Sequence, residues 1–252
     1  MLRVRRCSAG TWPGTVAVFP KRLASRAALV FALVLPLIGC RGDDGPPPPR
    51  PPVILCAGDS ITAGGYPWYL KRRLDEAGYR LQVTNAGEKG NTSGEYLDFL
   101  RRSRLLERTN PGWVLLQLGT NDVRSDGDAT PVERFRENLE AILDIVTGHR
   151  NPDGSSPRLL LATIPPVSVE IAGHFDAASR ARVDTEINPT IREIAGRRQI
   201  PLVDNHRLFA ARPELLSGVH PNEKGYRALG NSWYETLAPF LGARERTKAP
   251  EH

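Results

Sequence analysis

The chain has 252 residues and a formal net charge of +6, because 34 Lys and Arg residues outnumber 28 Asp and Glu residues. Six of the basic residues and no acidic residue lie within the first 26 positions, so the remainder carries 28 charges of each sign. This balanced remainder lacks the concentrated basic face that nucleic-acid binding needs, which excludes nucleic acid as an expected partner.

The first forty residues have the order of a secretory signal. The basic segment is followed by an apolar run over 27–38, which is too short to span a bilayer and is interrupted by Pro36. The run ends in Leu37-Ile38-Gly39-Cys40, which resembles the lipobox of bacterial lipoproteins. That resemblance implies that residues 1–40 are a lipoprotein signal peptide, that Cys40 is lipidated, and that the protein is anchored to a membrane surface of the bacterial cell envelope. A plain signal peptide, with secretion of the chain, is the alternative, and translation starting near Lys21 stays open.

The remaining chain divides into three parts. Residues 41–52 are rich in proline and predict an extended linker without a core. Residues 53–241 have ordinary apolar content and suffice for one buried domain, and the charged segment 242–252 predicts a disordered tail. Only Cys56 of the three cysteines lies in the expected domain, so no disulfide can form within it and Cys56 is expected to be a buried hydrophobe.

Apolar runs alternate with helical patterns through the domain. Strands are expected at Val53–Ala57, Leu81–Asn85, Trp113–Leu118, Arg158–Thr163 and Ile200–Asp204, and helices at 67–77, 94–106, 131–148, 178–198 and 223–240. Strands separated by helices require right-handed crossovers and a parallel sheet. The pattern therefore predicts an α/β fold, a three-layer α/β/α domain whose five-stranded parallel sheet has the flavodoxin-like order.

Residues suited to chemistry follow the first three expected strands. Ser60 stands in Gly58-Asp59-Ser60, where a hydroxyl is either a nucleophile or a helix cap. Gly90 lies in a glycine-containing turn whose N–H groups can face an oxyanion, although such a turn can also be purely structural. Asn121 offers two amide donors to a developing negative charge, and it too is a common turn residue.

Near the end of the domain, Gly218-Val219-His220-Pro221 precedes the last helical pattern. The unperturbed pKa of a histidine lies close to neutral pH, so His220 is a candidate general base for Ser60, although a solitary histidine is often structural.

Taken together, Gly58-Asp59-Ser60, Asn85-x-Gly-x-x-Gly90, Gly119-x-Asn121-Asp122 and Gly218-Val219-His220-Pro221 resemble the ordered motifs of the SGNH or GDSL hydrolase family. The resemblance covers Val53 to about Leu241. It implies that Ser60 is the nucleophile and that its own N–H, the N–H of Gly90 and the side chain of Asn121 form the oxyanion hole. It implies that His220 is the base.

One position departs from this pattern. The family usually has Asp three residues before the histidine, and this chain has Ser217. A neutral hydroxyl orients an imidazole poorly, so the identity of the catalytic acid is open. The alternatives are a Ser-His dyad in which the Ser217 carbonyl accepts from the imidazole, a displaced carboxylate such as Glu214, or a slowed or inactive enzyme.

The other polar residues are expected to be structural. His206 is expected to be a surface or packing histidine, and His149 and His174 are weaker candidates for the base. Asp59 is expected to shape the turn at Ser60, and Asp122 and Asp204 to accept from local backbone donors. No spacing of His, Cys and carboxylates suits a metal, so neither a metal nor a cofactor is expected.

The expected activity is that of a carboxylic ester hydrolase. The ending His220-Pro221-Asn-x-x-Gly225-Tyr226, with Trp233 and Tyr234, looks like that of carbohydrate acetylesterases in this family, which implies a glycan or other small ester carrying an acetyl group. The alternatives are a lysophospholipase or lipid esterase, an envelope glycan O-acyltransferase, and a non-catalytic glycan-binding lipoprotein. The loop from Ile164 to Phe175 is expected to shape the pocket, and the sequence does not indicate an oligomeric state.

Overall fold

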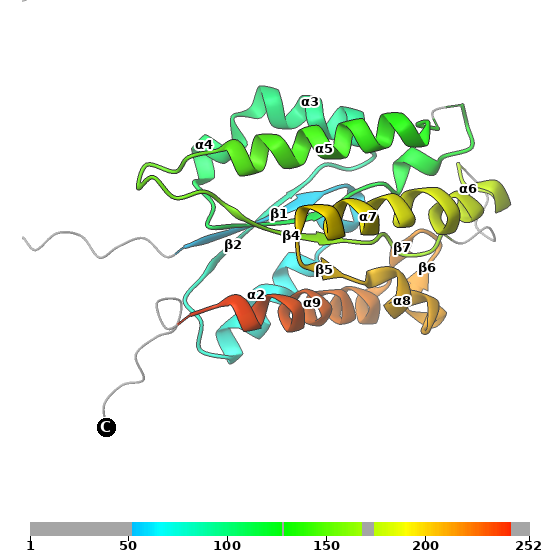
Figure 1. Ribbon diagram of the computed structural model, residues 1–252. Coiled ribbons are helices and arrows are strands. Elements are labelled where there is room, and N and C mark those ends of the chain that lie inside the picture. The colour runs from blue at the N-terminus through cyan, green and yellow to red at the C-terminus, as the bar shows by residue number, and fades with distance from the viewer. Residues whose placement is uncertain (1–51, 128, 168–173, 243–252) are drawn as a thin grey trace, which may run out of the picture. The chain divides into compact units, whose positions relative to one another are not determined.

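The computed structural model describes residues 52–127, 129–167 and 174–242 (Figure 1). The expected signal peptide with Cys40, the linker up to residue 51, residues 168–173 of the expected pocket loop and the tail from 243 lie outside the described residues. Within the described ranges, no helix combines the length and the apolar character that crossing a bilayer requires.

Five parallel strands form the central sheet in the order β2-β1-β3-β4-β5, as expected for the flavodoxin-like arrangement. They are β1 (Val53–Gly58), β2 (Gln82–Gly87), β3 (Trp113–Gln117), β4 (Arg158–Ala162) and β5 (Leu202–Val203). A separate antiparallel pair joins β6 (Leu216–Ser217) to β7 (His220–Pro221). The predicted fold class and strand order are therefore confirmed.

Helices cover both faces of the sheet (Figure 1). One face carries α3 (Ser93–Ser103), α4 (Leu105–Thr109), α5 (Val132–Gly148) and α7 (Asn188–Arg198). The other face carries α2 (Tyr66–Glu76), α8 (Asn205–Ala210) and α9 (Glu223–Leu237). The shorter segments are α1 (Ser60–Ala63), α6 (Ala177–Arg182), a π-helical turn η2 (Val183–Ile187) and the 3₁₀ turns η1 (Asn121–Val123), η3 (Pro213–Leu215) and η4 (Ala238–Phe240).

The core consists of two apolar clusters because successive strand residues face opposite sides of the sheet. In β1, Leu55 and Ala57 pack beneath α3 and α5, whereas Ile54 and Cys56 pack toward α2 and α9. Cys56 is fully buried, and burial raises the pKa of its thiol to about 12. This agrees with its expected role as a small hydrophobe.

The helix expected at 178–198 is divided into α6, η2 and α7. Buried Asn188 lies where the π-helical turn ends, and its amide bonds both the N–H and the C=O of Ile164 after β4, at 2.9 and 3.0 Å. The helix expected at 94–106 is also divided, because Arg104 has a left-handed φ of 50° and ends α3. Sequence periodicity did not reveal either interruption because the apolar spacing continues through both.

Candidate active site

The register of the sheet brings the ends of three strands to one edge. Gly58 at the end of β1 pairs with Gly87 of β2 on one side and with Gln117 of β3 on the other. Ser60, Gly90 and Asn121 follow these strand ends within a few residues. Parallel strands deliver their carboxyl ends to the same edge, so the three residues meet although they are distant in sequence.

Ser60 is the first residue of α1, immediately after the N-cap Asp59. The Asp59 carboxylate accepts from the Ile61 N–H at 2.9 Å, which confirms that Asp59 shapes this turn. A Cβ on Gly58 would lie 2.1 Å from the carbonyl oxygen of Gln117, so only glycine permits this close exit from β1. The N–H of a first helical residue has no partner within its helix and is therefore available to a ligand.

Gly90 lies in the turn after β2, with φ of 81°. The Asn91 N–H donates to the Glu88 carbonyl at 3.3 Å and closes the turn, while the Glu88 N–H donates to the carbonyl of Gly58 at 2.8 Å. These two bonds hold the Gly90 main chain beside the start of α1. Among the described residues, no hydrogen bond occupies the N–H of Gly90 or of Ser60.

Asn121 lies at the start of η1 with its side chain largely buried. Its Nδ2 donates to the carbonyl of Asn91 at 3.0 Å, which fixes the amide beside the Gly90 turn. An amide nitrogen carries two hydrogens, so one donor is left for an oxyanion. The sequence predicted this donor capacity, and the structure supplies its orientation.

Asp122, the residue after Asn121 in η1, holds this segment against the start of α3. Its buried carboxylate accepts from the N–H of Ser93 at 2.9 Å and from the Ser93 hydroxyl at 2.6 Å. Burial raises its pKa, and the bonds from Ser93 oppose that shift. Asp122 therefore satisfies local donors, as expected, and it joins η1 to the start of α3.

A tight hairpin carries His220. β6 and β7 are connected by Gly218 and Val219, and Gly218 has φ of 69°, which suits the first central position of a two-residue hairpin turn. Asn222 caps α9 by accepting from the Gly225 N–H at 3.0 Å, and its Nδ2 donates to the Glu214 carbonyl at 2.7 Å. The hairpin and α9 thus fix the position from which the imidazole extends.

Ser60 Oγ and His220 Nε2 are 2.8 Å apart, across 160 positions of sequence. Burial of the imidazole, and secondarily the positive charge of Lys89, lower the pKa of His220. The imidazole is therefore neutral at neutral pH and can accept the proton of the Ser60 hydroxyl.

The two expected candidates for the acid position differ in their surroundings. Ser217 pairs with His220 across the hairpin, so its main chain lies directly opposite that of the histidine. The Glu214 carboxylate contacts Arg212 Nε at 3.4 Å, and 66% of its side chain is exposed. The surroundings of Glu214 favour a surface ion pair over a place behind the imidazole.

A cavity of about 440 Å³ opens over these groups. Ser60, His220, Gly90 and Asn121 line it together, so the structure brings all four sequence-predicted residues to one space. The other lining residues are Gly64, Lys89, Arg124, His174, Phe175, Val219 and Tyr226. Within the described ranges, no cluster of His, Cys and carboxylates is arranged to hold a metal ion.

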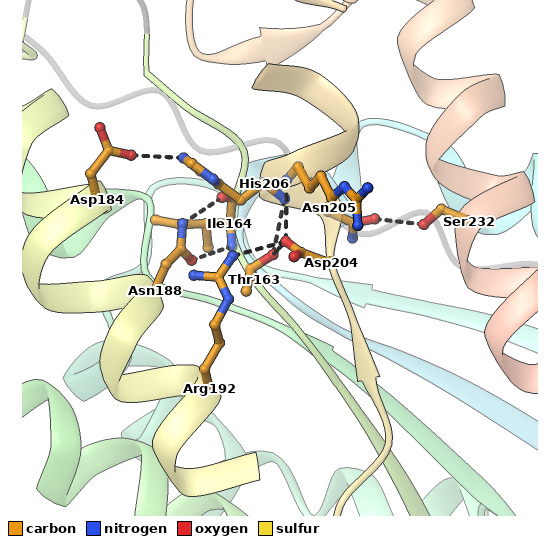
Figure 2. Close-up of polar contacts among 10 residues, drawn as sticks. Thr163, Ile164, Asp184, Asn188, Arg192, Asp204, Asn205, His206 and Ser232 are labelled. Atoms are coloured by element: carbon orange, nitrogen blue, oxygen red, sulfur yellow. Dashed lines mark hydrogen bonds and ion pairs between the residues drawn. The ribbon is translucent and has the colours of Figure 1, made fainter. Parts of the chain in front are cut away.

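A larger cavity, of about 560 Å³, adjoins Ser217 and Gly218 but is lined by neither Ser60 nor His220. Its wall includes His206, whose Nε2 lies 2.7 Å from Asp184 Oδ1 and whose N–H donates to Thr163 Oγ1 at 2.9 Å (Figure 2). Asp204 accepts from the Arg207 N–H at 3.1 Å, from Thr163 and from Arg192. These contacts agree with the expected packing role of His206 and the local role of Asp204.

Among the residues that line the active-site cavity, sequence reasoning missed Lys89 and Arg124. Lys89 adjoins the expected Gly90 and Arg124 follows Asp122 by two positions, so proximity to the motifs could have indicated both. Tyr226 reaches the cavity from α9, and its hydroxyl lies where a side chain at Gly64 would otherwise extend. Phe175 comes from the loop that was expected to shape the pocket. Trp233, in contrast, is fully buried and stacks on Tyr66, away from the cavity lining.

Comparison with known proteins agrees with the family resemblance of the sequence and with the α/β fold. Residues 56–228 match the GDSL-like Lipase/Acylhydrolase family. A crystal structure of a lipase/acylhydrolase from Enterococcus faecalis superposes with a TM-score of 0.65 at 25% identity, covering 79% of this chain and 100% of that one.

Two characterised relatives are esterases. A multidomain esterase from Ruminococcus flavefaciens is 26% identical over 232 residues, which cover 76% of this chain but only 29% of that protein. Esterase TesA from Pseudomonas aeruginosa is 29% identical over 185 residues, covering 68% of this chain and 87% of TesA. The chain therefore spans less than a third of the first relative and most of the second.

Proposed function

The chain belongs to the GDSL-like lipase/acylhydrolase family, and on that premise we propose that it is a serine esterase in which Ser60 is the nucleophile and His220 the base. Carboxylic ester hydrolysis is the reaction class of the family and agrees with the activity expected from the sequence. The observation that carries the residue roles is the 2.8 Å contact between Ser60 Oγ and His220 Nε2 beside the Gly90 turn and Asn121.

The geometry supports a two-stage reaction. His220 Nε2 takes the hydroxyl proton as Ser60 Oγ bonds to the ester carbonyl carbon. The resulting oxyanion accepts from the N–H groups of Ser60 and Gly90 and from Asn121 Nδ2. The bond to the alcohol oxygen then breaks, and that oxygen receives the proton from His220. Water then gives a proton to His220 as its oxygen bonds to the acyl carbon. The bond from that carbon to Ser60 Oγ breaks, and Oγ receives the proton from His220 as the acid leaves.

We propose a small acyl group, acetyl above all, on a glycan or a similar alcohol. The cavity has a volume of about 440 Å³ and combines the polar groups around Ser60 with the apolar surfaces of Phe175, Val219 and Tyr226, which suits a short acyl group on a sugar-sized alcohol. A long acyl chain would need an extended apolar channel to become buried. A lysophospholipase is therefore the second candidate, supported only by the proposed membrane location.

We propose that the imidazole is assisted by the main chain of Ser217 and not by a carboxylate. The hairpin register places Ser217 opposite His220, while Glu214 engages Arg212. Ser217→Asp is then expected to raise kcat by about tenfold or more, because an ionised carboxylate stabilises the imidazolium; loss of a triad Asp costs about 10⁴ in a serine protease. If Glu214→Ala abolishes turnover instead, the acid role belongs to Glu214.

The proposed activity is tested by labelling and by turnover. A fluorophosphonate probe is expected to label the purified chain at Ser60 and to leave Ser60→Ala unlabelled. Ser125→Ala is the matched control, because it removes a hydroxyl near Asn121 but outside the cavity lining. Acetyl esters are expected to be hydrolysed faster than octanoyl or palmitoyl esters of the same alcohol. An unlabelled Ser60 would instead favour the non-catalytic glycan-binding alternative.

Product analysis separates a hydrolase from an O-acyltransferase, which would use the same two residues but exclude water. Free acetate is expected with or without an acceptor glycan. Acetylated acceptor appearing in place of acetate would assign the chain to the transferases.

We further propose a location on the surface of a cell-envelope membrane, through a lipid on Cys40. The support is the basic and apolar order of residues 1–40 and their lipobox-like end. Metabolic labelling with palmitate is expected to mark the full chain and not Cys40→Ser. Cys7→Ser is the control, because Cys7 would leave with the signal peptide.

A further inference from the structure

Among the residues that the structure describes, basic side chains line the active-site cavity without acidic ones. Its lining includes the side chains of Lys89 and Arg124 and the imidazoles of His174 and His220, and among its described lining residues there is no Asp or Glu. These groups line the cavity in which the ester must lie, so their charge faces the substrate.

Lys89 supplies the uncompensated part of this charge. It is exposed, it precedes Gly90 in the turn after β2, and no ion pair joins it to an acidic group in the described part of the chain. Its field reaches the reacting groups, since it contributes to lowering the pKa of His220. The ammonium of Lys89 thus acts across the cavity in which the ester must lie.

Arg124 also lines the cavity, and Asp126 holds its guanidinium in place. Its Nε donates to Asp126 Oδ1 at 3.2 Å and its Nη2 also contacts that carboxylate. Asp126 additionally lies 2.5 Å from Nδ1 of His174. The Asp126 carboxylate offsets the positive charge of Arg124 and fixes the direction of its guanidinium. The net charge of the described lining therefore depends on Lys89.

We propose that this cavity selects esters whose alcohol portion carries a carboxylate, as in an acetylated acidic sugar, and that Lys89 is the residue that recognises the charge. The inference rests on the proposed function, because an acetyl group has no place for a charge and the anion must then belong to the alcohol. The cavity volume of about 440 Å³ is sufficient for a sugar ring beside the reacting groups. Attraction between the exposed Lys89 and such a carboxylate is modest and is screened by salt.

The test compares two substrates that differ only in charge: an acetylated methyl glucuronoside and its uronamide. The wild-type chain is expected to favour the carboxylate by about fivefold in kcat/KM at low salt, and this preference is expected to shrink at 1 M NaCl. Lys89→Gln is expected to bring the ratio to about one, and Lys89→Arg to retain it. Taking the ratio within each variant cancels any change in general activity.

Arg102→Gln is the matched control. It removes one positive charge from an exposed position of α3 outside the cavity lining, so the ratio should keep its wild-type value. Calorimetric binding of the same two esters to Ser60→Ala gives a readout that needs no turnover. The same preference, lost on adding Lys89→Gln, is expected there.

The outcomes distinguish this inference from the proposed function. Equal turnover of the two esters by a chain whose Ser60 is labelled would overturn the inference and leave the esterase assignment intact. Equal binding by Ser60→Ala would overturn it as well. An unlabelled Ser60, together with preferred binding of the carboxylate, would instead remove the catalytic assignment and keep the charge recognition.

Discussion

At the scale of single residues, the charge of Lys89 and the basicity of His220 are connected. Both residues line one cavity. Burial is the larger cause of the lowered pKa of His220, and the positive charge of Lys89 is the second. A lowered pKa keeps the base neutral in weak acid, at the expense of its proton affinity. Lys89 is therefore expected to affect the proposed catalysis by His220 as well as the proposed recognition of a charged alcohol.

This connection predicts the pH profile. The base works only when neutral, so the acidic limb of kcat/KM for a neutral acetyl ester should lie below the ordinary histidine pKa of 6.5. Lys89→Gln removes a repelling charge, which raises the pKa of His220 and moves the limb to higher pH. Arg102→Gln should leave the limb where it is. An unmoved limb in Lys89→Gln would show that the two groups are not coupled.

At the scale of elements, the site depends on how closely α1 approaches the ends of β1 and β3. A Cβ on Gly58 would lie 2.1 Å from the Gln117 carbonyl oxygen and 2.5 Å from Thr62 Oγ1. The first of these atoms belongs to the backbone of β3 and cannot move without disturbing the sheet. The glycine in Gly58-Asp59-Ser60 therefore has a packing reason independent of chemistry.

Gly58→Ala is accordingly expected to lower the free energy of unfolding by about 3 kcal/mol. Gly196→Ala in α7 is the matched control. No atom lies within 4 Å of the Cβ position at Gly196, and the residue is exposed within the helix, so the substitution should stabilise by about 0.5–1 kcal/mol. Urea denaturation followed by circular dichroism measures both changes. Equal midpoints for Gly58→Ala and the wild type would contradict the packing argument.

At the scale of the whole molecule, the buried carboxyl of Asp59, next to the proposed nucleophile Ser60, links the candidate active site to the stability of the fold. Asp59 is fully buried, and burial raises its pKa from an ordinary 3.8 to about 6, against the opposing bond from the Ile61 N–H. Because the folded pKa exceeds the unfolded one, ionisation of this group favours unfolding as pH rises from about 4 to about 6. At neutral pH the charge costs about 3 kcal/mol.

Asp59→Asn should relieve this cost while keeping an oxygen that can cap α1. The substitution is expected to raise the free energy of unfolding above that of the wild type, and this increase should be about 1 kcal/mol larger at pH 7 than at pH 5. Asp153→Asn is the control, because bonds from Ser155 lower the pKa of exposed Asp153 below its ordinary 3.8, so this group is ionised at both pH values and its substitution should have the same effect at each. Denaturant titrations at the two pH values measure these differences. The same effect of Asp59→Asn at pH 5 and pH 7 would contradict a buried charge on Asp59.

Much of the architecture follows from local patterns. Apolar runs such as Val53–Ala57 predicted the five strands, because a strand buried on both faces is apolar without interruption. Helical spacing between those runs predicted the crossovers and hence a parallel sheet. The limits of two elements differ from the prediction: the strand expected at Ile200–Asp204 is only Leu202–Val203, and the helix expected at 178–198 is interrupted by η2. Strands and helices end where their main-chain hydrogen bonds end, and the sequence pattern does not show where that is.

By itself, the sequence determined the fold class, the family resemblance and the set formed by Ser60, Gly90, Asn121 and His220, since each depends on residue types at short spacings. Only the tertiary structure decided that Ser60 and His220 are 2.8 Å apart, that Asn121 keeps one donor free, and that Lys89 and Arg124 share the cavity with them. The physical reason is that these relations join residues up to 160 positions apart. Their separation in space is set by sheet register and hairpin geometry, and no pattern along the chain records it.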